Sequence, residues 1–233
     1  MKSTLLIPVL NEAEGMKQIM PKINRNWFDQ ILIVDGGSKD GTLEYAEQNG
    51  YQIIRQKKKG IRYAYIEAME HITGDVVVTF SPDGNSIPEL LPELLNKMSE
   101  GFDMVIVSRY LDGAKSEDDD LFTGFGNWLF TTLINKVHSA KYTDAMVIYR
   151  AWKKELFYKL NLHLDSSYQP EEKLFFTRVG VEPLLSIRAA KYKCNFREIP
   201  GDEPPRIGGE RKLRVIQWGL AYMFEVFKEK IIK

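Results

Sequence analysis

The sequence predicts an α/β protein built on a mainly parallel central sheet with flanking helices, and two observations lead to that prediction. Short apolar segments alternate with segments of helical spacing through the first 110 residues. The short segments are apolar almost throughout, as expected of strands that helices cover on both faces. Such alternation produces parallel strands joined by right-handed crossovers. Beyond Tyr110 the alternation ends, and we expect a smaller C-terminal α+β portion there.

Each element follows from a local pattern. In the first half, apolar runs predict strands at residues 4–9, 31–34, 51–55, 75–80 and 103–107. The spacing of apolar residues and the turn signals between these runs predict helices at residues 14–24, 42–48, 61–72 and 87–98. Pro88 suits the first turn of the last of these helices. In the second half we expect helices at residues 125–137 and 214–230, and strands at residues 146–149, 184–187 and 192–199.

Length and composition narrow the function classes. The 233 residues suffice for one good-sized core. The 32 basic and 32 acidic residues cancel, so nothing favours nucleic acid as a partner. Cys194 is the only cysteine, which fits a reducing compartment. The first apolar run breaks at Pro8, too early for a signal sequence, and no run reaches the roughly 18 residues of a membrane span. We expect a cytoplasmic protein, with peripheral contact at the inner face of the membrane left open.

The carboxyl ends of the predicted strands indicate where a ligand binds, because ligands of parallel sheets sit outside those ends. Four segments qualify: residues 9–12, 35–41, 81–85 and 108–110. Asp35 follows a strand, and the turn after it opens a helix whose first amides can hold an anion. Its carboxylate could accept hydrogen bonds from a base or a ribose. A tight turn with a capped helix explains these residues equally well.

The turn at residues 81–85 offers oxygen ligands for a divalent ion. Asp83 and Asn85 supply a carboxylate and an amide oxygen on one side of the turn. The same sequence also forms ordinary turns, so this pattern alone is weak. The basic run at residues 57–62, which includes Lys59 and Gly60, lies between the two candidate turns. Such a run is usually a solvated surface, but at this place it could approach a diphosphate. Neither a GxGxxG fingerprint nor a P-loop is present, and the histidines lack ligand spacing.

Taken in order, these segments resemble glycosyltransferase family 2, and within it the dolichyl- or polyprenyl-phosphate mannosyl- and glucosyltransferase group. The likeness extends over about residues 4 to 213 and rests on seven blocks. They are I-P-V-L-N-E at 7–12, I-V-D-G-G-S-K-D-G-T at 33–42, residues 60–75, residues 81–89, S-R-Y at 108–110, residues 143–150, and residues 198–213. One such block would be weak evidence, but seven in the right order are strong.

The resemblance implies a GT-A fold over residues 1–213, with a nucleotide-sugar half (1–110) and an acceptor half (111–213), followed by an amphipathic helix at 214–233. It implies inverting transfer of a sugar from a UDP- or GDP-sugar to a polyprenyl phosphate or a glycan, assisted by Mg²⁺ or Mn²⁺, as in cell-envelope polysaccharide synthesis. Together with the strand-end reasoning, it gives a donor-binding set of Pro8, Asn11, Glu12, Asp35, Gly37, Ser38, Lys59, Gly60, Asp83 and Arg206.

The same resemblance assigns the remaining roles. Asp83 and Asn85 would hold the metal, and Arg109 would face the diphosphate or a phosphorylated acceptor. A hydroxyl acceptor needs a carboxylate to take its proton, for which Asp144 and Glu182 are the candidates.

Departures from the family pattern keep alternatives open. Ser81 stands where the first aspartate of the family's DxD motif belongs, and Gly36 replaces the second aspartate of VDDGS. The loop at residues 117–120 is acidic and should repel a phosphate acceptor unless a metal bridges them. One alternative is therefore a weakly active or inactive nucleotide-sugar-binding relative. A sugar nucleotidyltransferase ranks lower, because residues 8–12 occupy the place of its glycine-rich basic loop.

The C-terminal segment has its own open question. Residues 214–230 are apolar on most of the helix circumference and have basic residues at both ends. Such a helix can lie in a membrane interface, pack on the core or form a homodimer. Glu225 and Glu229 would suit anionic lipid poorly, which favours core or dimer packing. The sugar, the nucleotide, the acceptor and the oligomeric state are not evident from the sequence.

Overall fold

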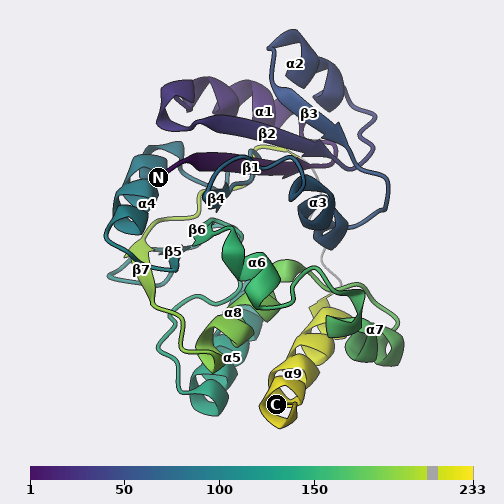
Figure 1. Ribbon diagram of the computed structural model, residues 1–233, viewed down its shortest axis with the longest axis vertical. Helices are drawn as coiled ribbons and strands as arrows, with labels where there is room; N and C mark the ends of the chain where they lie inside the picture. The colour runs from purple at the N-terminus through teal and green to yellow at the C-terminus, as the bar shows by residue number, and fades with distance from the viewer. Residues whose placement is uncertain (209–214, 233) are drawn as a thin grey trace.

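The computed structural model describes residues 1–208 and 215–232, with the side chains of 215 and 216 left out. It confirms the α/β prediction. Within these residues one sheet has the strand order β3-β2-β1-β4-β6-β5-β7 (Figure 1). Its strands are β1 (Ser3–Val9), β2 (Gln30–Asp35), β3 (Gln52–Arg55), β4 (Val76–Thr79), β5 (Met104–Ser108), β6 (Arg150–Lys153) and β7 (Phe196–Pro200). Only β6 runs antiparallel to its neighbours, so the sheet is mainly parallel as predicted.

Helices cover the sheet on both sides. In the first half they are α1 (Ala13–Ile19), α2 (Thr42–Gln48), α3 (Ile61–Ala68) and α4 (Leu91–Ser99). In the second half they are α5 (Leu121–His138), α6 (Glu155–Lys159), α7 (Gln169–Phe175), α8 (Val181–Lys191) and α9 (Val215–Ile231). Short 3₁₀ turns occur at Met20–Lys22, Arg25–Trp27, Pro88–Leu90 and Asp165–Ser167. Figure 1 shows α1 and α2 above β1–β3, and α5, α7, α8 and α9 gathered below the sheet.

Two predicted strands are wrong. Residues 184–187 lie inside α8, whose residues are buried on nearly every side, so the segment lacks the polar positions that reveal a helix. Residues 146–149 are an irregular turn before β6, which begins only at Arg150. The buried guanidinium of Arg150 donates to the carbonyls of Ala145 and Val147, and these bonds hold the turn in place of a strand ladder.

Other boundaries differ in smaller ways. The predicted strand at residues 192–199 begins later, at Phe196. The helix predicted at residues 125–137 begins earlier, at Leu121, because the Asp120 carboxylate caps its first amides. The predicted boundary at 213/214 and the basic residues Arg211, Lys212 and Arg214 lie outside the described residues.

Helix α9 packs on the core of its own chain, against α5, α7 and α8. Ala221, Tyr222 and Val226 are buried in this packing. The acidic side chains also point inward. Glu229 pairs with Arg188 at 2.7 Å and with Lys191 at 3.1 Å. Among the helices whose residues are described, none is long and apolar enough to cross a membrane.

Glu225 makes the stability of this packing depend on pH. Burial raises the pKa of its carboxyl well above the usual range, and the neighbouring Glu171 raises it further. A raised pKa means that the protonated form stabilises the fold, and this contribution is lost as pH rises from 4.5 through the raised pKa. We expect Glu225→Gln, which cannot ionise, to unfold at a higher temperature than the wild type, with the gap widening from pH 5 to pH 9.

Thermal unfolding at a series of pH values measures this gap. The matched control is Glu70→Gln, at an exposed position near the end of α3. If the difference in unfolding temperature between the wild type and Glu225→Gln is the same at every pH, the buried carboxyl of Glu225 is not protonated as inferred.

Candidate functional site

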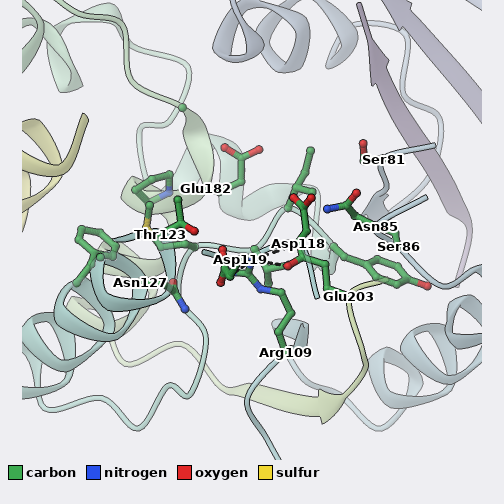
Figure 2. A pocket seen from close by; sticks show the side chains of 18 of the residues that line it. Ser81, Asn85, Ser86, Arg109, Asp118, Asp119, Thr123, Asn127, Glu182 and Glu203 are labelled. Atoms are coloured by element: carbon green, nitrogen blue, oxygen red, sulfur yellow. Dashed lines mark hydrogen bonds and ion pairs between the residues drawn. The ribbon is translucent and has the colours of Figure 1, made fainter. Parts of the chain in front are cut away.

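A cavity of about 480 Å³ lies where several strands end. Its wall contains the segments that follow β4, β5 and β7, together with the turn before the antiparallel β6. Helices α5, α8 and α9 complete it. Glu12, the segment at 81–85 and Arg109 lie in this wall, so three of the four predicted strand ends meet at one cavity. Figure 2 shows Ser81 and Asn85 on one side, Thr123 and Asn127 on the other, and Arg109 between them.

Two glycines allow the turn at residues 81–85 to pack closely. A side chain at Gly15 of α1 would meet the Pro82 carbonyl oxygen at 2.4 Å. Gly84 has φ of +97°, a conformation that favours glycine, and a side chain there would meet Ile207 at 2.6 Å. The amide of Ile207 donates to the carbonyl of Asp83 at 2.8 Å. The turn is therefore held between α1 and the segment that carries Arg206.

Asp83 is the charged centre of this turn. Its carboxylate is buried, with Oδ2 at 2.9 Å from Nη1 of Arg206 and Oδ1 accepting from the Asn85 amide at 3.1 Å. The same Arg206 nitrogen lies 4.0 Å from Glu12 Oε1. Asn85 Oδ1 is buried and has no hydrogen-bond partner within the described chain. A carboxylate beside an unsatisfied amide oxygen is a donor pair that suits Mg²⁺ or Mn²⁺.

These two side chains do not form a complete cage. Among the residues whose positions are described, no three His, Cys, Asp or Glu side chains lie together as metal ligands. An ion bound to Asp83 and Asn85 would therefore take its other ligands from water or from phosphate oxygens. Mg²⁺ commonly binds in this way, through one or two protein ligands and the phosphates of a substrate.

Arg109 follows the carboxyl end of β5, and its side chain is 12% exposed and surrounded by carboxylates. It donates to both oxygens of Asp144, at 2.6 Å from Nε and 3.1 Å from Nη2. Its Nη1 lies 3.0 Å from Glu203 Oε2 and 3.9 Å from Asp119 Oδ2. Burial alone would lower the pKa of Arg109, but Asp144 and Glu203 outweigh it and raise the pKa well above the usual value. Arg109 is thus a fixed cation whose donors are already engaged.

Asp144 lies beneath Arg109, outside the cavity wall. It is fully buried, and the amides of Thr143 and Asp144 both donate to the carboxylate of Glu198, at 2.8 and 3.0 Å. Burial would raise the pKa of Asp144, but Arg109 lowers it below the usual value. A carboxylate with this environment is a weak proton acceptor and a strong anchor for Arg109.

Glu182 stands in the first turn of α8 with its side chain in the cavity wall. The hydroxyl of Tyr65 donates to its Oε1 at 2.5 Å. Tyr65 is fully buried, and burial and Glu182 raise its pKa well above the usual value, so this hydroxyl keeps its proton. Of the two predicted candidate bases, Glu182 is the one that faces the cavity.

The predicted nucleoside contacts gather beside the cavity, at the ends of β1 and β2. The Asp35 carboxylate accepts from the amides of Gly37 and Ser38, both at 3.1 Å. Asn11 is tied to the same turn, since its amide donates to Ser38 Oγ at 2.9 Å. Asp35 therefore does cap its own turn. Glu12 belongs to both regions, because it also lines the cavity.

The remaining predicted residues lie at the edges of this region. Pro8 is near the end of β1. Lys59 and Gly60 precede α3, where the Lys59 carbonyl accepts from Arg178 at 2.6 Å and the Gly60 carbonyl from Gln56 at 2.7 Å. The predicted site residues that line the cavity together are Glu12, Asp83, Asn85, Arg109, Glu182 and Arg206.

Sequence reasoning missed Glu203, which lies beside Arg109 (Figure 2) and accepts from its Nη1, while Asp144 accepts from Nε and Nη2. The strand-end rule would have found it, because Glu203 follows the carboxyl end of β7 and β7 pairs in parallel with β5. The sequence does not show which strand the predicted strand at 192–199 pairs with. Its carboxyl end was therefore not among the predicted ligand-binding segments.

The far half of the cavity is mostly apolar, although Thr123 and Asn127 of α5 also line it. Helix α5 contributes Leu129 and Phe130, and α9 contributes Trp218, Tyr222 and Met223. The turn before β6 adds Met146, Val147 and Ile148. The cavity therefore joins a charged end at Asp83 and Arg206 to an apolar end between α5 and α9.

Comparison with known families identifies the chain. The model described as "Glycosyl transferase family 2" matches residues 4–160. The chain belongs to glycosyltransferase family 2. It is 28% identical to the glycosyltransferase AglJ of Haloferax volcanii over 229 residues, 96% of this chain and 70% of that protein. It is 33% identical to the dolichol-phosphate mannosyltransferase of Pyrococcus furiosus over 126 residues, 51% of this chain and 36% of that protein.

Further relatives extend the comparison. An undecaprenyl-phosphate 4-deoxy-4-formamido-L-arabinose transferase of Klebsiella pneumoniae is 26% identical over 78% of this chain and 58% of its own length. The chain thus spans well under two thirds of two of the three relatives. Glucosyl-3-phosphoglycerate synthase of Mycobacterium tuberculosis, solved with Mn²⁺, UDP and phosphoglyceric acid, superposes with a TM-score of 0.69 at 16% identity. That match covers 100% of this chain and 79% of the other, and it confirms the GT-A fold.

Proposed function

We propose that this glycosyltransferase moves a sugar from a UDP- or GDP-sugar to a polyprenyl phosphate, with a divalent ion and inversion at the anomeric carbon. The observation that carries the proposal is the two-ended cavity, with Asp83 and Arg206 at one end and apolar side chains of α5 and α9 at the other. Such a cavity suits a diphosphate donor next to an acceptor that has a charged head and an apolar tail. Relatives named for undecaprenyl phosphate and dolichol phosphate support this choice.

The donor end would stabilise the leaving diphosphate. Asp83 and Asn85 would hold Mg²⁺ or Mn²⁺, which, when bound, offsets the negative charge that develops as the sugar departs. Arg206, 2.9 Å from Asp83, adds a second positive charge at the same place. The turns that Asp35 and Asn11 organise beside this end would bind the nucleoside.

The acceptor end sets what kind of nucleophile attacks. A polyprenyl phosphate is already an anion and needs no base, whereas the hydroxyl of a glycan must lose a proton. Asp119 and Glu203 would repel an anionic acceptor, but both carboxylates are directed at Arg109, which offsets part of their charge. A glycan acceptor would depend on Glu182, which Tyr65 holds in place.

Glu182→Gln therefore discriminates between the two acceptors. With a polyprenyl phosphate we expect kcat to stay within about tenfold of the wild type, since no proton is transferred. With a hydroxyl acceptor we expect a loss of about 10²- to 10⁴-fold, the usual contribution of a general base. Steady-state rates with each acceptor measure the effect, and Tyr65→Phe is the companion variant, because it frees the carboxylate without removing it.

The proposal is tested by product formation. The protein is incubated with UDP- and GDP-sugars, Mn²⁺ or Mg²⁺ and a short-chain prenyl phosphate, and the glycosylated lipid is sought by mass spectrometry. We expect sugar-linked prenyl phosphate and an equal amount of nucleoside diphosphate. Donor binding in thermal-shift assays without product from any acceptor would instead support the alternative of an inactive binding relative, to which Ser81 in the DxD position points.

A further inference from the structure

Arg206 occupies the carboxylate that a divalent ion would need. Its Nη1 lies 2.9 Å from Oδ2 of Asp83, the charged member of the predicted metal-binding pair. The same nitrogen lies 4.0 Å from Oε1 of Glu12. Because the Asp83 side chain is buried, a cation held against it offsets a charge that water solvates poorly. An arginine thus stands at the carboxylate that would hold the ion.

Two polar atoms next to this ion pair are buried and have no hydrogen-bond partner among the described residues. One is the donor Nε of Arg206, and the other is the acceptor Oδ1 of Asn85. Buried polar atoms are nearly always paired in folded proteins, so two unpaired ones at a single turn indicate a ligand. A phosphate oxygen would satisfy the arginine alone, and a cation would satisfy the asparagine alone. A ligand that contains both satisfies both.

We infer that this turn takes a divalent ion together with a diphosphate and excludes the free ion, a step that rests on the proposed function and narrows it. A free ion would have to share Asp83 with the guanidinium of Arg206, and two cations so close repel each other. Diphosphate oxygens would accept from Arg206 and leave the carboxylate to the ion. The ion and the diphosphate would then each strengthen the binding of the other.

The local structure lets this exchange proceed by rotation of one side chain. The backbone beside Arg206 is fixed, since the amide of Ile207 donates to the Asp83 carbonyl at 2.8 Å. A side chain at Gly84 would meet Ile207 at 2.6 Å, which shows how closely this segment packs on the turn. The Arg206 side chain, in contrast, is 26% exposed. Its guanidinium can therefore turn from Asp83 to a phosphate while the backbone that carries it stays in place.

Binding of Mn²⁺ to the full chain, without nucleotide or acceptor, tests the inference. The wild type and Arg206→Met are titrated with Mn²⁺, and the free ion is followed by electron paramagnetic resonance. We expect Arg206→Met to bind Mn²⁺ at least about tenfold more tightly, because removal of the guanidinium leaves Asp83 to the ion. Substitution of a residue that merely supports the site would weaken binding, so a gain in affinity is specific to competition.

Two further variants locate the effect. Arg55→Met removes the same charge from an exposed position, where the arginine pairs with Glu47, and it should bind Mn²⁺ as the wild type does. Asp83→Asn/Arg206→Met lacks the carboxylate and should lose the gain. Melting temperatures establish that each variant is folded.

Nucleotide binding gives a second measurement. The affinities of the wild type and Arg206→Met for UDP and GDP are measured by calorimetry with and without Mn²⁺. We expect Mn²⁺ to strengthen nucleotide binding more in the wild type than in Arg206→Met, because in the variant the ion no longer depends on a diphosphate to reach Asp83.

Three results would overturn the inference. They are equal Mn²⁺ affinities of the wild type and Arg206→Met, no Mn²⁺ binding by either protein, and a gain in affinity that persists in Asp83→Asn/Arg206→Met. None of these measurements involves sugar transfer. If Arg206→Met gains affinity for Mn²⁺ while the wild type glycosylates no acceptor, the proposed function fails and the competition at Asp83 stands.

Discussion

Asp83→Asn is expected to lower kcat at least about a hundredfold while leaving the fold intact. Asparagine keeps the shape of the side chain and can still accept from the Asn85 amide, but it removes the negative charge that would bind a divalent ion. Loss of one electrostatic contact to a developing charge commonly costs about 10²- to 10³-fold in rate. The cost should be high here because, in the described parts of the chain, no group of three or more histidine, cysteine or acidic side chains could hold the ion without Asp83.

The matched control for Asp83→Asn is Asp75→Asn. Asp75 is exposed at the amino end of β4, the opposite end of the strand that leads to Asp83. Rates of nucleoside diphosphate release and melting temperatures are compared for both variants, and Mn²⁺ binding is followed by electron paramagnetic resonance. An Asp83→Asn protein that turns over at the wild-type rate and binds Mn²⁺ equally well would exclude Asp83 as the metal ligand.

The first half of the fold was predictable because its signals are local. Buried parallel strands read as short apolar runs, and the polar residues that end them mark the ligand side of the sheet. That reasoning placed Asp35 and Asp83 at strand ends, where the structure has them. It could not show that the Asp35 carboxylate is engaged by the amides of its own turn, because a cap and a ligand contact use the same residues.

The second half was harder because its signals are not local. The residues of α8 are buried on nearly every side, so apolar periodicity cannot separate a helix from a strand. The assembly around Arg109 joins side chains from three distant segments, with Asp144 before β6 and Glu203 after β7. Their meeting depends on β6 and β7 flanking β5, and this strand order is a property of the whole sheet.

Measuring the free energy of unfolding can show whether Asp144 is a structural partner of Arg109 or a catalytic base. We expect Asp144→Asn to destabilise the protein by about 3–5 kcal/mol, because it leaves the buried guanidinium of Arg109 without its bidentate partner. Since the pKa of Asp144 is lowered in the folded protein, the ion pair contributes fully above pH 3.8 and is lost as pH falls through the lowered pKa. The stability gap between wild type and variant should therefore be full at neutral pH and shrink in acid.

Chemical denaturation of Asp144→Asn, Arg109→Met and the double variant measures this effect as a double-mutant cycle. If the two side chains act as a pair, the double variant will lose much less stability than the sum of the single losses, since no buried charge is left uncompensated between them. A catalytic base would give the opposite pattern, with near-normal stability and a selective loss of transfer to hydroxyl acceptors. The geometry favours the first outcome, because both oxygens of Asp144 face Arg109 and neither reaches the cavity where an acceptor would bind.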